Sequence, residues 1–328
     1  MMTGRGSLLL GVDGGNTKTI ALIAAPDGEI LAAARGGNSD IYACESPEAA
    51  IGEICRLVGD ALAAAGVHAR ALRGSAFSLA GADWPEDFEL LEAQLTRRLG
   101  LVHRPQIVND SLGALRSGAP SWEGIAVACG TFNAIGARNR DGRSFHLGFW
   151  PDQRGGHDLG LAALKAVYRQ GFDLGPATSL TGRVLELFRA PDAGALLHAF
   201  TRRDERISAK ELGRLAPVLL DEADRGDAVA HAIVVEAGAI LGRQARVCAQ
   251  RVGLEIVGVN VVLTGGVLAH PTTRLAEAIM ACLPGAVPRR TSAPPVTGAL
   301  LLAFDAAGLP MSADRLSGGV AAVLAPGG

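Results

Sequence analysis

Two segments of this chain repeat one layout of short apolar strands and tight turns, and the repeat restricts the possible folds more than any other feature. The first segment predicts strands over 7–13, 19–25 and 29–34, joined by a glycine turn and by Pro26-Asp27-Gly28. The second predicts strands over 124–129, 133–138 and 143–149, joined by Gly130-Thr131 and by Asp141-Gly142. Asp-Gly between alternating apolar residues is a strong hairpin signal. Helical patterns follow both segments, over 47–65 and 159–169.

The agreement between the two segments has two explanations. Such turns are common, so two unrelated meanders could resemble one another by chance. Alternatively, one domain has been duplicated, and both first turns then face a single ligand across a cleft. Duplication explains more of the pattern, and a length of 328 residues suggests about two domains.

The turn after the first strand, Asp13-Gly14-Gly15-Asn16-Thr17-Lys18, has the groups that a phosphate site needs. Glycine lacks a Cβ, so backbone N–H groups can approach an anion closely, and the threonine and lysine add donors. Asp13 would repel a bare phosphate, which indicates Mg²⁺ between the carboxylate and the phosphates. The segment is not a Walker A loop, because Gly-Lys-Ser/Thr after four spacer residues is absent. It is not a dinucleotide fingerprint, because a strand and not a helix follows. The same residues could also form only a tight hairpin.

Apolar strands alternate with helices between the two repeats, with strands over 71–79 and 106–108 and a helix over 86–99. This alternation predicts an α/β fold whose ligands lie at the carboxyl ends of the strands. Four groups fall at such ends: Asp13, Ala80-Gly81, Asp110 and Gly130. Asp110 could serve there as a functional carboxylate or simply as the N-cap of the following helix.

The rest of the chain is predicted to be mostly helical up to residue 252. Helices are expected over 177–188, 191–200, 208–223 and 227–252. A buried strand follows over 259–263, and Thr264-Gly265-Gly266 forms a turn into a helix that begins near His270. The last helix is expected over 298–307.

Composition excludes several classes of protein. The formal net charge of -2 gives no electrostatic footprint for nucleic acid, and no apolar run approaches the length of a membrane span. The five cysteines, Cys44, Cys55, Cys129, Cys248 and Cys282, form no CxxC pair, which argues against a zinc ribbon, a cysteine-held cluster and a disulfide framework. We therefore expect a soluble, cytoplasmic enzyme.

Four segments occur in an order that resembles the sugar kinase/Hsp70/actin superfamily: Gly11–Thr19, Val108-Asn109-Asp110, Cys129–Asn133 and Leu263–Val267. Within it, the chain is similar to the BadF/BadG/BcrA/BcrD ATPase family, which includes N-acetylglucosamine and glucosamine kinases. The resemblance implies two actin-like (ribonuclease H-like) domains with a duplicated strand–hairpin–helix core and a nucleotide cleft between them. Residues 1–115 would form the first domain, with a helix over 298–310 packing back on it. Residues 116–297 would form the second domain with a helical insertion, and 311–328 a tail.

The resemblance also implies roles for individual residues in a kinase that uses ATP and Mg²⁺. Asp110 matches the carboxylate that accepts the proton of the attacking sugar hydroxyl, and Asp13 would order the Mg²⁺, through water. Matching nucleotide-binding positions are Gly14, Gly15, Asn16, Thr17, Lys18, Gly130, Thr131, Asn133, Gly265 and Gly266. Matching sugar-binding positions are Asn38, Gly81, Asp110 and Asp152.

Two departures from the family pattern keep other functions open. Phe132 replaces the second glycine of the second phosphate motif, and Gln153-Arg154 follow Asp152 where the family has a carboxylate and a glycine. Arg154 could bind an anionic group of the substrate. The alternatives are an ATP- and sugar-binding sensor with weakened kinase activity, or an ATPase activator of a CoA dehydratase or reductase. The chain is expected to bind neither nucleic acid nor membrane, and a homodimer is one option. The sequence does not identify the sugar or the hydroxyl.

Overall fold

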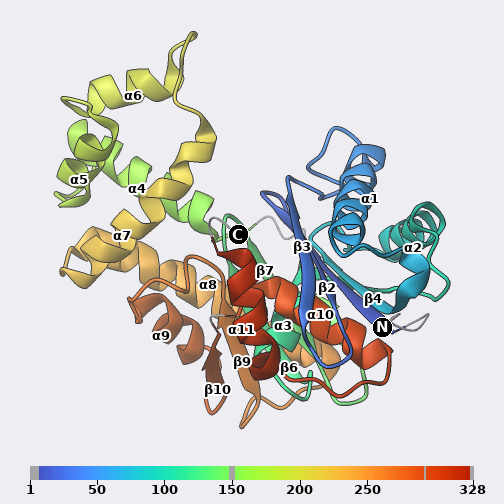
Figure 1. Ribbon diagram of the computed structural model, residues 1–328. Coiled ribbons are helices and arrows are strands. Elements are labelled where there is room, and N and C mark those ends of the chain that lie inside the picture. Colours follow the sequence, from blue (N-terminus) through green and yellow to red (C-terminus); the bar gives the residue numbers. More distant parts are fainter. Residues whose placement is uncertain (1–6, 148–151, 292, 326–328) are drawn as a thin grey trace.

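The computed structural model describes residues 7–147, 152–291 and 293–325, and two five-stranded sheets form its core (Figure 1). The first sheet has the order β3-β2-β1-β4-β5, with β1 Leu8–Gly14, β2 Thr19–Ala24, β3 Ile30–Gly36, β4 Leu72–Leu79 and β5 Gln106–Asn109. The strands β1, β2 and β3 form an antiparallel meander, whereas β4 pairs with β1 and β5 with β4 in parallel.

The second sheet repeats the first, strand for strand. Its order is β10-β9-β6-β7-β8, with β6 Gly124–Cys129, β7 Asn133–Arg138, β8 Ser144–His146, β9 Asn260–Thr264 and β10 Val287–Arg290. Here β6, β7 and β8 form the antiparallel meander, and β9 and β10 add in parallel. The structure therefore confirms the predicted α/β fold with a duplicated strand–hairpin core.

Helices cover both faces of the first sheet. Alternate residues of a strand point to opposite faces. Leu8, Leu10 and Val12 accordingly pack against α1 (Pro47–Ala64) and α2 (Pro85–Leu99), whereas Leu9 packs against α10 (Pro295–Ala306). The last part of the chain thus returns to the first sheet, as Figure 1 also shows. Where the domain boundaries fall along the chain stays a prediction.

Two helices, α3 (Asp110–Gly118) and α10, cross between the halves of the molecule. The helix α3 follows β5 but packs on the second sheet, where Ala114 and Leu115 meet Ala126 and Val262. The helix α10 follows β10 but packs on the first sheet. The two helices also touch, and a Cβ added to Gly298 would lie 1.9 Å from the Gly113 carbonyl oxygen. Only glycine at position 298 permits this approach.

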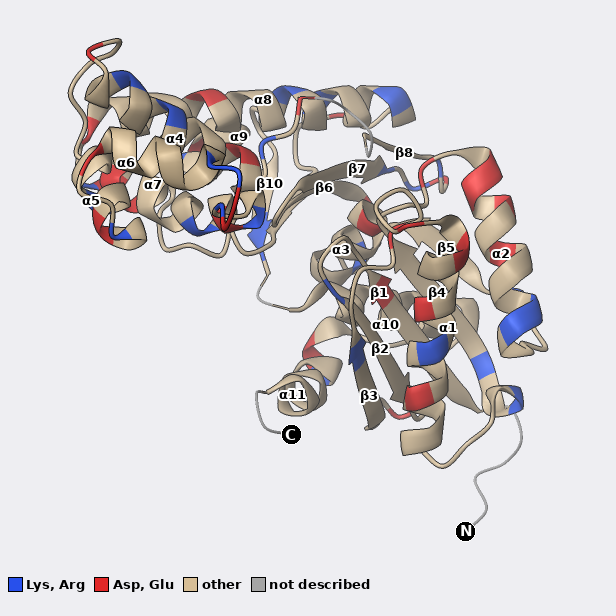
Figure 2. Cartoon of the chain, turned by 90° about the horizontal axis from the view of Figure 1, so that it is seen from above, with Lys and Arg blue, Asp and Glu red and all other residues tan. Residues whose placement is uncertain are grey.

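A helical group extends the second half. Its members are α4 Gly156–Gly171, α5 Leu180–Phe188, α6 Ala193–Thr201, α7 Leu215–Asp224, α8 Ala228–Val252 and α9 Arg274–Ala281. Figure 2 shows α8 along the strands β6 and β7, with α4 to α7 beyond the sheet. One hydrophobic core joins these helices to the second sheet.

Two predicted helices begin later than expected, and a proline accounts for each. The helix predicted over 208–223 is divided into the 3₁₀ helix η2 (Ala209–Arg214) and α7, because Pro217 has no N–H and fits only in a first turn. The helix predicted near His270 begins at Arg274, because Pro271 disfavours helical backbone at the residue before it.

The strand β10 and the helix α11 (Ala313–Leu324) were not predicted, and both have weak sequence signals. The strand β10 contains Pro288, is exposed throughout and lies at the edge of its sheet, where proline is tolerated. The segment 311–328 contains α11, although Gly318-Gly319 interrupts its pattern. Leu316 and Val320 are four residues apart and fully buried, and they hold α11 against the first half. Of the strand predicted over 143–149, residues 148 and 149 lie outside the described residues.

Candidate active site

The turn between β1 and β2 has the strand–turn–strand geometry that the sequence predicts. The Gly15 N–H donates to the Lys18 carbonyl oxygen (3.0 Å) and closes the turn. A Cβ added to Gly14 would lie 2.5 Å from Ser39 Oγ, so this glycine lets the following loop approach. Thr17 and Lys18 are exposed, and Asp13 is half-buried near the end of β1. Backbone donors and an ammonium group are thus available beside one carboxylate.

The loop over 37–41 lies against this turn and contains the predicted sugar ligand Asn38. Asn16 Nδ2 donates to Asp40 Oδ2 (2.8 Å) and ties the loop to the turn. The Asp40 N–H donates to Asn38 Oδ1 (2.9 Å) and fixes the Asn38 carboxamide. A Cβ added to Gly81 would lie 2.8 Å from Asp40 Oδ1. Close packing against Asp40 therefore requires glycine at position 81. This contact brings the end of β4 next to the loop over 37–41.

The predicted base, Asp110, is the first residue of α3 and is not its cap. Asn109 is the N-cap, because its Oδ1 accepts hydrogen bonds from the Ser111 N–H (3.1 Å) and from Ser111 Oγ (2.5 Å). The alternative in which Asp110 serves only as an N-cap is therefore wrong. The Asp110 side chain is half-buried at the start of α3.

Four carboxyl groups gather where β1, β4 and β5 end: Asp13, Asp40, Asp83 and Asp110. Burial, followed by the charge of Asp110, raises the pKa of Asp13 to about 7. Burial, with Asp110 and Asp40 nearby, raises the pKa of Asp83 to about 7. Burial and Asp40 raise the pKa of Asp110 to about 6, although backbone N–H groups, including that of Ser111, oppose the shift. Clustered carboxyl groups with strongly shifted pKa values are typical of functional sites.

Two members of this cluster, Asp40 and Asp83, were not among the predicted site residues. Each lies two residues beyond a position that was predicted, Asn38 and Gly81 respectively. Short loops at strand ends bring neighbouring residues to one site. The position of Asp40 and Asp83, two residues beyond predicted site residues, was therefore the sequence signal that could have identified them.

The second glycine turn, between β6 and β7, is supported by the start of α4. The Gly130 N–H donates to the Phe132 carbonyl oxygen (2.9 Å). The Gly130 carbonyl accepts from the Gly156 N–H (2.8 Å), and the Thr131 carbonyl accepts from the His157 N–H (3.0 Å). The Phe132 side chain points outward, 44% exposed, with its ring 5.9 Å from the His157 ring. The pair Gly155-Gly156 is a supporting feature that the sequence reasoning missed.

Asn133 joins this turn to the segment that contains Asp152. Asn133 Oδ1 accepts from the Arg154 N–H (2.5 Å), and Gln244 Nε2 on α8 donates to the Asp152 carbonyl oxygen (2.9 Å). The Asp152 carboxylate pairs with Arg154 Nη2 at 2.6 Å, so an acidic ligand is not needed to balance Arg154. Pro151, which precedes this pair, lies outside the described residues.

The two glycines after β9 differ in what requires them. Gly265 has φ +94°, and a Cβ there would lie 2.4 Å from the Cys129 carbonyl oxygen, so the fold itself needs glycine. A Cβ on Gly266 would meet no atom within 4 Å. Gly266 therefore borders open space in which a nucleoside could lie.

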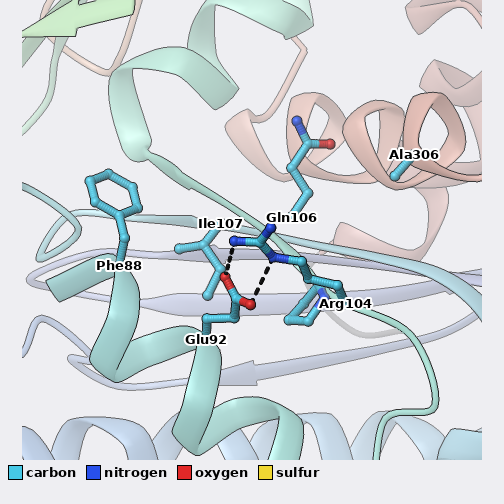
Figure 3. A pocket seen from close by; sticks show the side chains of 7 residues that line it. Phe88, Glu92, Arg104, Gln106, Ile107 and Ala306 are labelled. Carbon is cyan, nitrogen blue, oxygen red and sulfur yellow. Dashed lines mark hydrogen bonds and ion pairs between the residues drawn. The ribbon is translucent and has the colours of Figure 1, made fainter. Parts of the chain in front are cut away.

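A cavity of about 390 Å³ lies on the outer side of the first sheet, between α2, β5 and α10 (Figure 3). Glu92 and Arg104 point toward each other there and form an ion pair (2.7 Å). The cavity borders Gln106 at the start of β5, whereas Asp110 follows the end of that strand. It is therefore distinct from the carboxyl cluster.

Neither a membrane span nor a self-sufficient metal cluster is found among the described residues. No helix there is long and apolar enough to cross a membrane. No three His, Cys, Asp or Glu side chains of that part of the chain are arranged to hold a metal ion together.

Two duplicated sheets, crossing helices and glycine turns at the strand ends define an actin-like ATPase fold. The chain belongs to the BadF/BadG/BcrA/BcrD ATPase family, whose model matches residues 10–303. It is 28% identical over 264 residues to an N-acetylmuramic acid/N-acetylglucosamine kinase of Clostridium acetobutylicum, covering 79% of this chain and 85% of that protein. It is 26% identical over 313 residues to an N-acetyl-D-glucosamine kinase of Dictyostelium discoideum, covering 91% and 98%. The solved structure of a putative N-acetylglucosamine kinase from Chromobacterium violaceum matches with a TM-score of 0.67 at 26% identity, covering 90% and 99%.

Proposed function

We propose that this chain is an ATP-dependent kinase that phosphorylates a hydroxyl group of an amino sugar of the N-acetylglucosamine or glucosamine type. One observation carries the proposal: Asp110 is not the N-cap of α3, lies in a cluster of carboxyl groups at the strand ends and has a raised pKa. The family and the named activities of the relatives support the same reaction.

Asp110 acts as the general base. A carboxyl group with a pKa of about 6 is largely ionised at neutral pH, yet it is basic enough to accept a proton efficiently. It accepts the proton of the sugar hydroxyl as that oxygen attacks the γ-phosphate of ATP, and ADP leaves. Phosphoryl transfer depends mostly on positioning and charge, so one carboxylate beside the nucleophile suffices.

The residues at the two glycine turns fit Mg·ATP. Burial beside Asp110 disfavours the charged form of Asp13, so a cation there would stabilise its carboxylate. Mg²⁺ prefers one or two carboxylates with phosphate oxygens and water, and when bound it would neutralise charge on the transferred phosphate. Phosphate contacts are proposed for Gly14, Gly15, Asn16, Thr17, Lys18, Gly130 and Thr131, and nucleoside contacts for Gly265 and Gly266.

The sugar is held between the two halves of the molecule. Asn38 and Gly81 come from loops of the first half, and Asp152 comes from the segment that Asn133 and Gln244 hold in the second. Hydroxyl recognition needs such fixed acceptors and donors. We propose that Asn133 supports this segment in addition to the phosphate turn.

A second candidate function is a sugar-binding sensor, which the presence of Phe132 in the second turn favours. Purified protein, ATP and Mg²⁺ are incubated with glucosamine, N-acetylglucosamine, N-acetylmuramic acid or glucose. ADP release is measured together with the mass of the sugar product. A kinase yields a sugar phosphate with one ADP for each product molecule. Saturable sugar binding without any sugar phosphate would establish the sensor instead.

A further inference from the structure

A contact between the two halves of the molecule reaches the helix cap beside the proposed base. Asp83, in the loop between β4 and α2, accepts a hydrogen bond at Oδ1 from Asn109 Nδ2 (2.9 Å). Asn109 uses its other atom, Oδ1, to accept from the Ser111 N–H. Asp83 therefore fixes which way the Asn109 carboxamide faces, and that orientation caps the helix that begins with Asp110.

His146 meets Asp83 from the opposite half. It is the last residue of β8, the edge strand of the second sheet, whereas Asp83 belongs to the first half. His146 Nε2 donates to the Asp83 carbonyl oxygen at 3.1 Å and lies 3.6 Å from Asp83 Oδ1. Both side chains are shielded, with 16% of His146 and 6% of Asp83 exposed. The His146 ring also makes an edge contact with Phe88 on α2 (6.4 Å between centroids).

Burial at this contact favours a neutral imidazole. Burial lowers the pKa of His146, against the opposing effect of the Asp83 carbonyl. The carboxyl groups that face Asp83 are Asp110, Asp40 and Asp87. Burial and these neighbours raise the pKa of Asp83 to about 7. His146 therefore acts at neutral pH as an N–H donor and not as a charged partner.

The second sheet touches the same helix turn at another point. A Cβ added to Gly136 on β7 would lie 2.3 Å from Ser111 Oγ. The first turn of α3 thus lies close against β7, and Asn109 and Asp83 link it to β8.

We propose that His146 and Asp83 are positioning residues that link the second sheet to Asn109 and thereby hold Asp110 in place for proton transfer. The inference rests on the proposed function, because it assigns Asp110 the role of base. No part of it requires His146 or Asp83 to touch the sugar or ATP. A loss of the link should therefore lower kcat and leave ATP binding unchanged.

The test compares variants that remove the link with variants that keep it. His146→Phe keeps a ring beside Phe88 but removes the N–H donor, and Asp83→Ala removes the acceptor for Asn109. His146→Gln keeps a donor at the end of the side chain, and Asp83→Asn keeps an acceptor oxygen. His103→Phe is the matched control, because His103 is a shielded histidine that pairs with Ser75 Oγ (2.9 Å) away from α3. Tm, kcat, KM for both substrates and hydrogen exchange of the Ser111 and Leu112 amides are measured.

We expect kcat to fall about tenfold in His146→Phe, since one net hydrogen bond corresponds to that order and a small misplacement of a base is costly. In Asp83→Ala, kcat should fall further. In the two conservative variants, His146→Gln and Asp83→Asn, kcat should stay within about twofold of the wild-type value. KM for ATP should not change in any of the four variants. The Ser111 amide should exchange faster in His146→Phe and Asp83→Ala only. His103→Phe should alter Tm without altering kcat.

An unchanged kcat in His146→Phe, or an equal loss in His146→Gln, would overturn the inference. The exchange measurement needs no turnover and decides the link independently. Unchanged protection of Ser111 in Asp83→Ala would also overturn it. Wild-type protein that phosphorylates no sugar would instead contradict the proposed function.

Discussion

The contact between α3 and α10 allows a stability prediction of defined sign. In Gly298→Ala, the new Cβ would lie 1.9 Å from the Gly113 carbonyl oxygen and 3.0 Å from the Ser117 nitrogen. Ordinary contact begins at 3.4 Å, so the two helices must separate by about 1.5 Å. Both groups are backbone, so no side-chain rotation can relieve the clash. Overpacking costs about 1–3 kcal/mol, and alanine returns at most about 1 kcal/mol of helix propensity. We expect a net loss of about 1 kcal/mol.

Gly59→Ala is the matched control. Gly59 is exposed in α1, and a Cβ there would meet no atom within 4 Å. The same substitution should therefore stabilise by about 0.5–1 kcal/mol. Urea unfolding of the two variants and the wild type gives the three midpoints. The reasoning is refuted if Gly298→Ala unfolds at the same urea concentration as the wild type, or at a higher one.

Three further predictions concern the carboxyl groups of the site. Asp13→Asn should weaken Mg²⁺-dependent use of ATP while leaving Tm intact, and an unchanged Mg²⁺ titration would remove Asp13 from the site. Asp152→Asn should raise KM for the sugar roughly tenfold without changing KM for ATP, because a hydrogen bond to a charged group is lost at a partly exposed position. The pKa of Asp83 is raised from 3.8 to about 7, so the folded state retains a proton that the unfolded state releases, and stability falls as pH rises between these values. Asp83→Asn should accordingly raise Tm at pH 8 but not at pH 4, and equal gains at both would contradict the assigned shift.

The sequence predicted those elements in which the apolar pattern and the flanking turn residues indicate the same structure. The strands of the first repeat and most of the second were placed to within about two residues, because apolar runs bounded by Asp27-Gly28 and Asp141-Gly142 have few alternatives. The same pattern gave no sign of β10, where Pro288 and exposed arginines stand in an edge strand that pairs with β9. Local propensity cannot report such tertiary support.

The candidate site was partly predictable for a similar reason. Asp13 and Asp110 could be found because they lie at the ends of strands, and strand ends meet at one edge of a sheet. The contact between His146 and Asp83 could not, since it joins residues 63 positions apart through the relative placement of two sheets. Asn109 was likewise unpredicted as the cap, because Asn and Asp serve this role equally well and the sequence offers both in succession.

The most direct test of the account measures kcat, ATP affinity and Tm together in Asp110→Asn. A general base contributes about 10²–10⁴-fold, so kcat for sugar phosphorylation should fall by at least 100-fold. ATP affinity should stay within about twofold of the wild type. Tm should not fall, because Asn109 and not Asp110 caps α3, and because the substitution removes a carboxyl group that burial disfavours. Retention of more than about a tenth of the wild-type kcat at an unchanged Tm would contradict the assignment of Asp110 as the base.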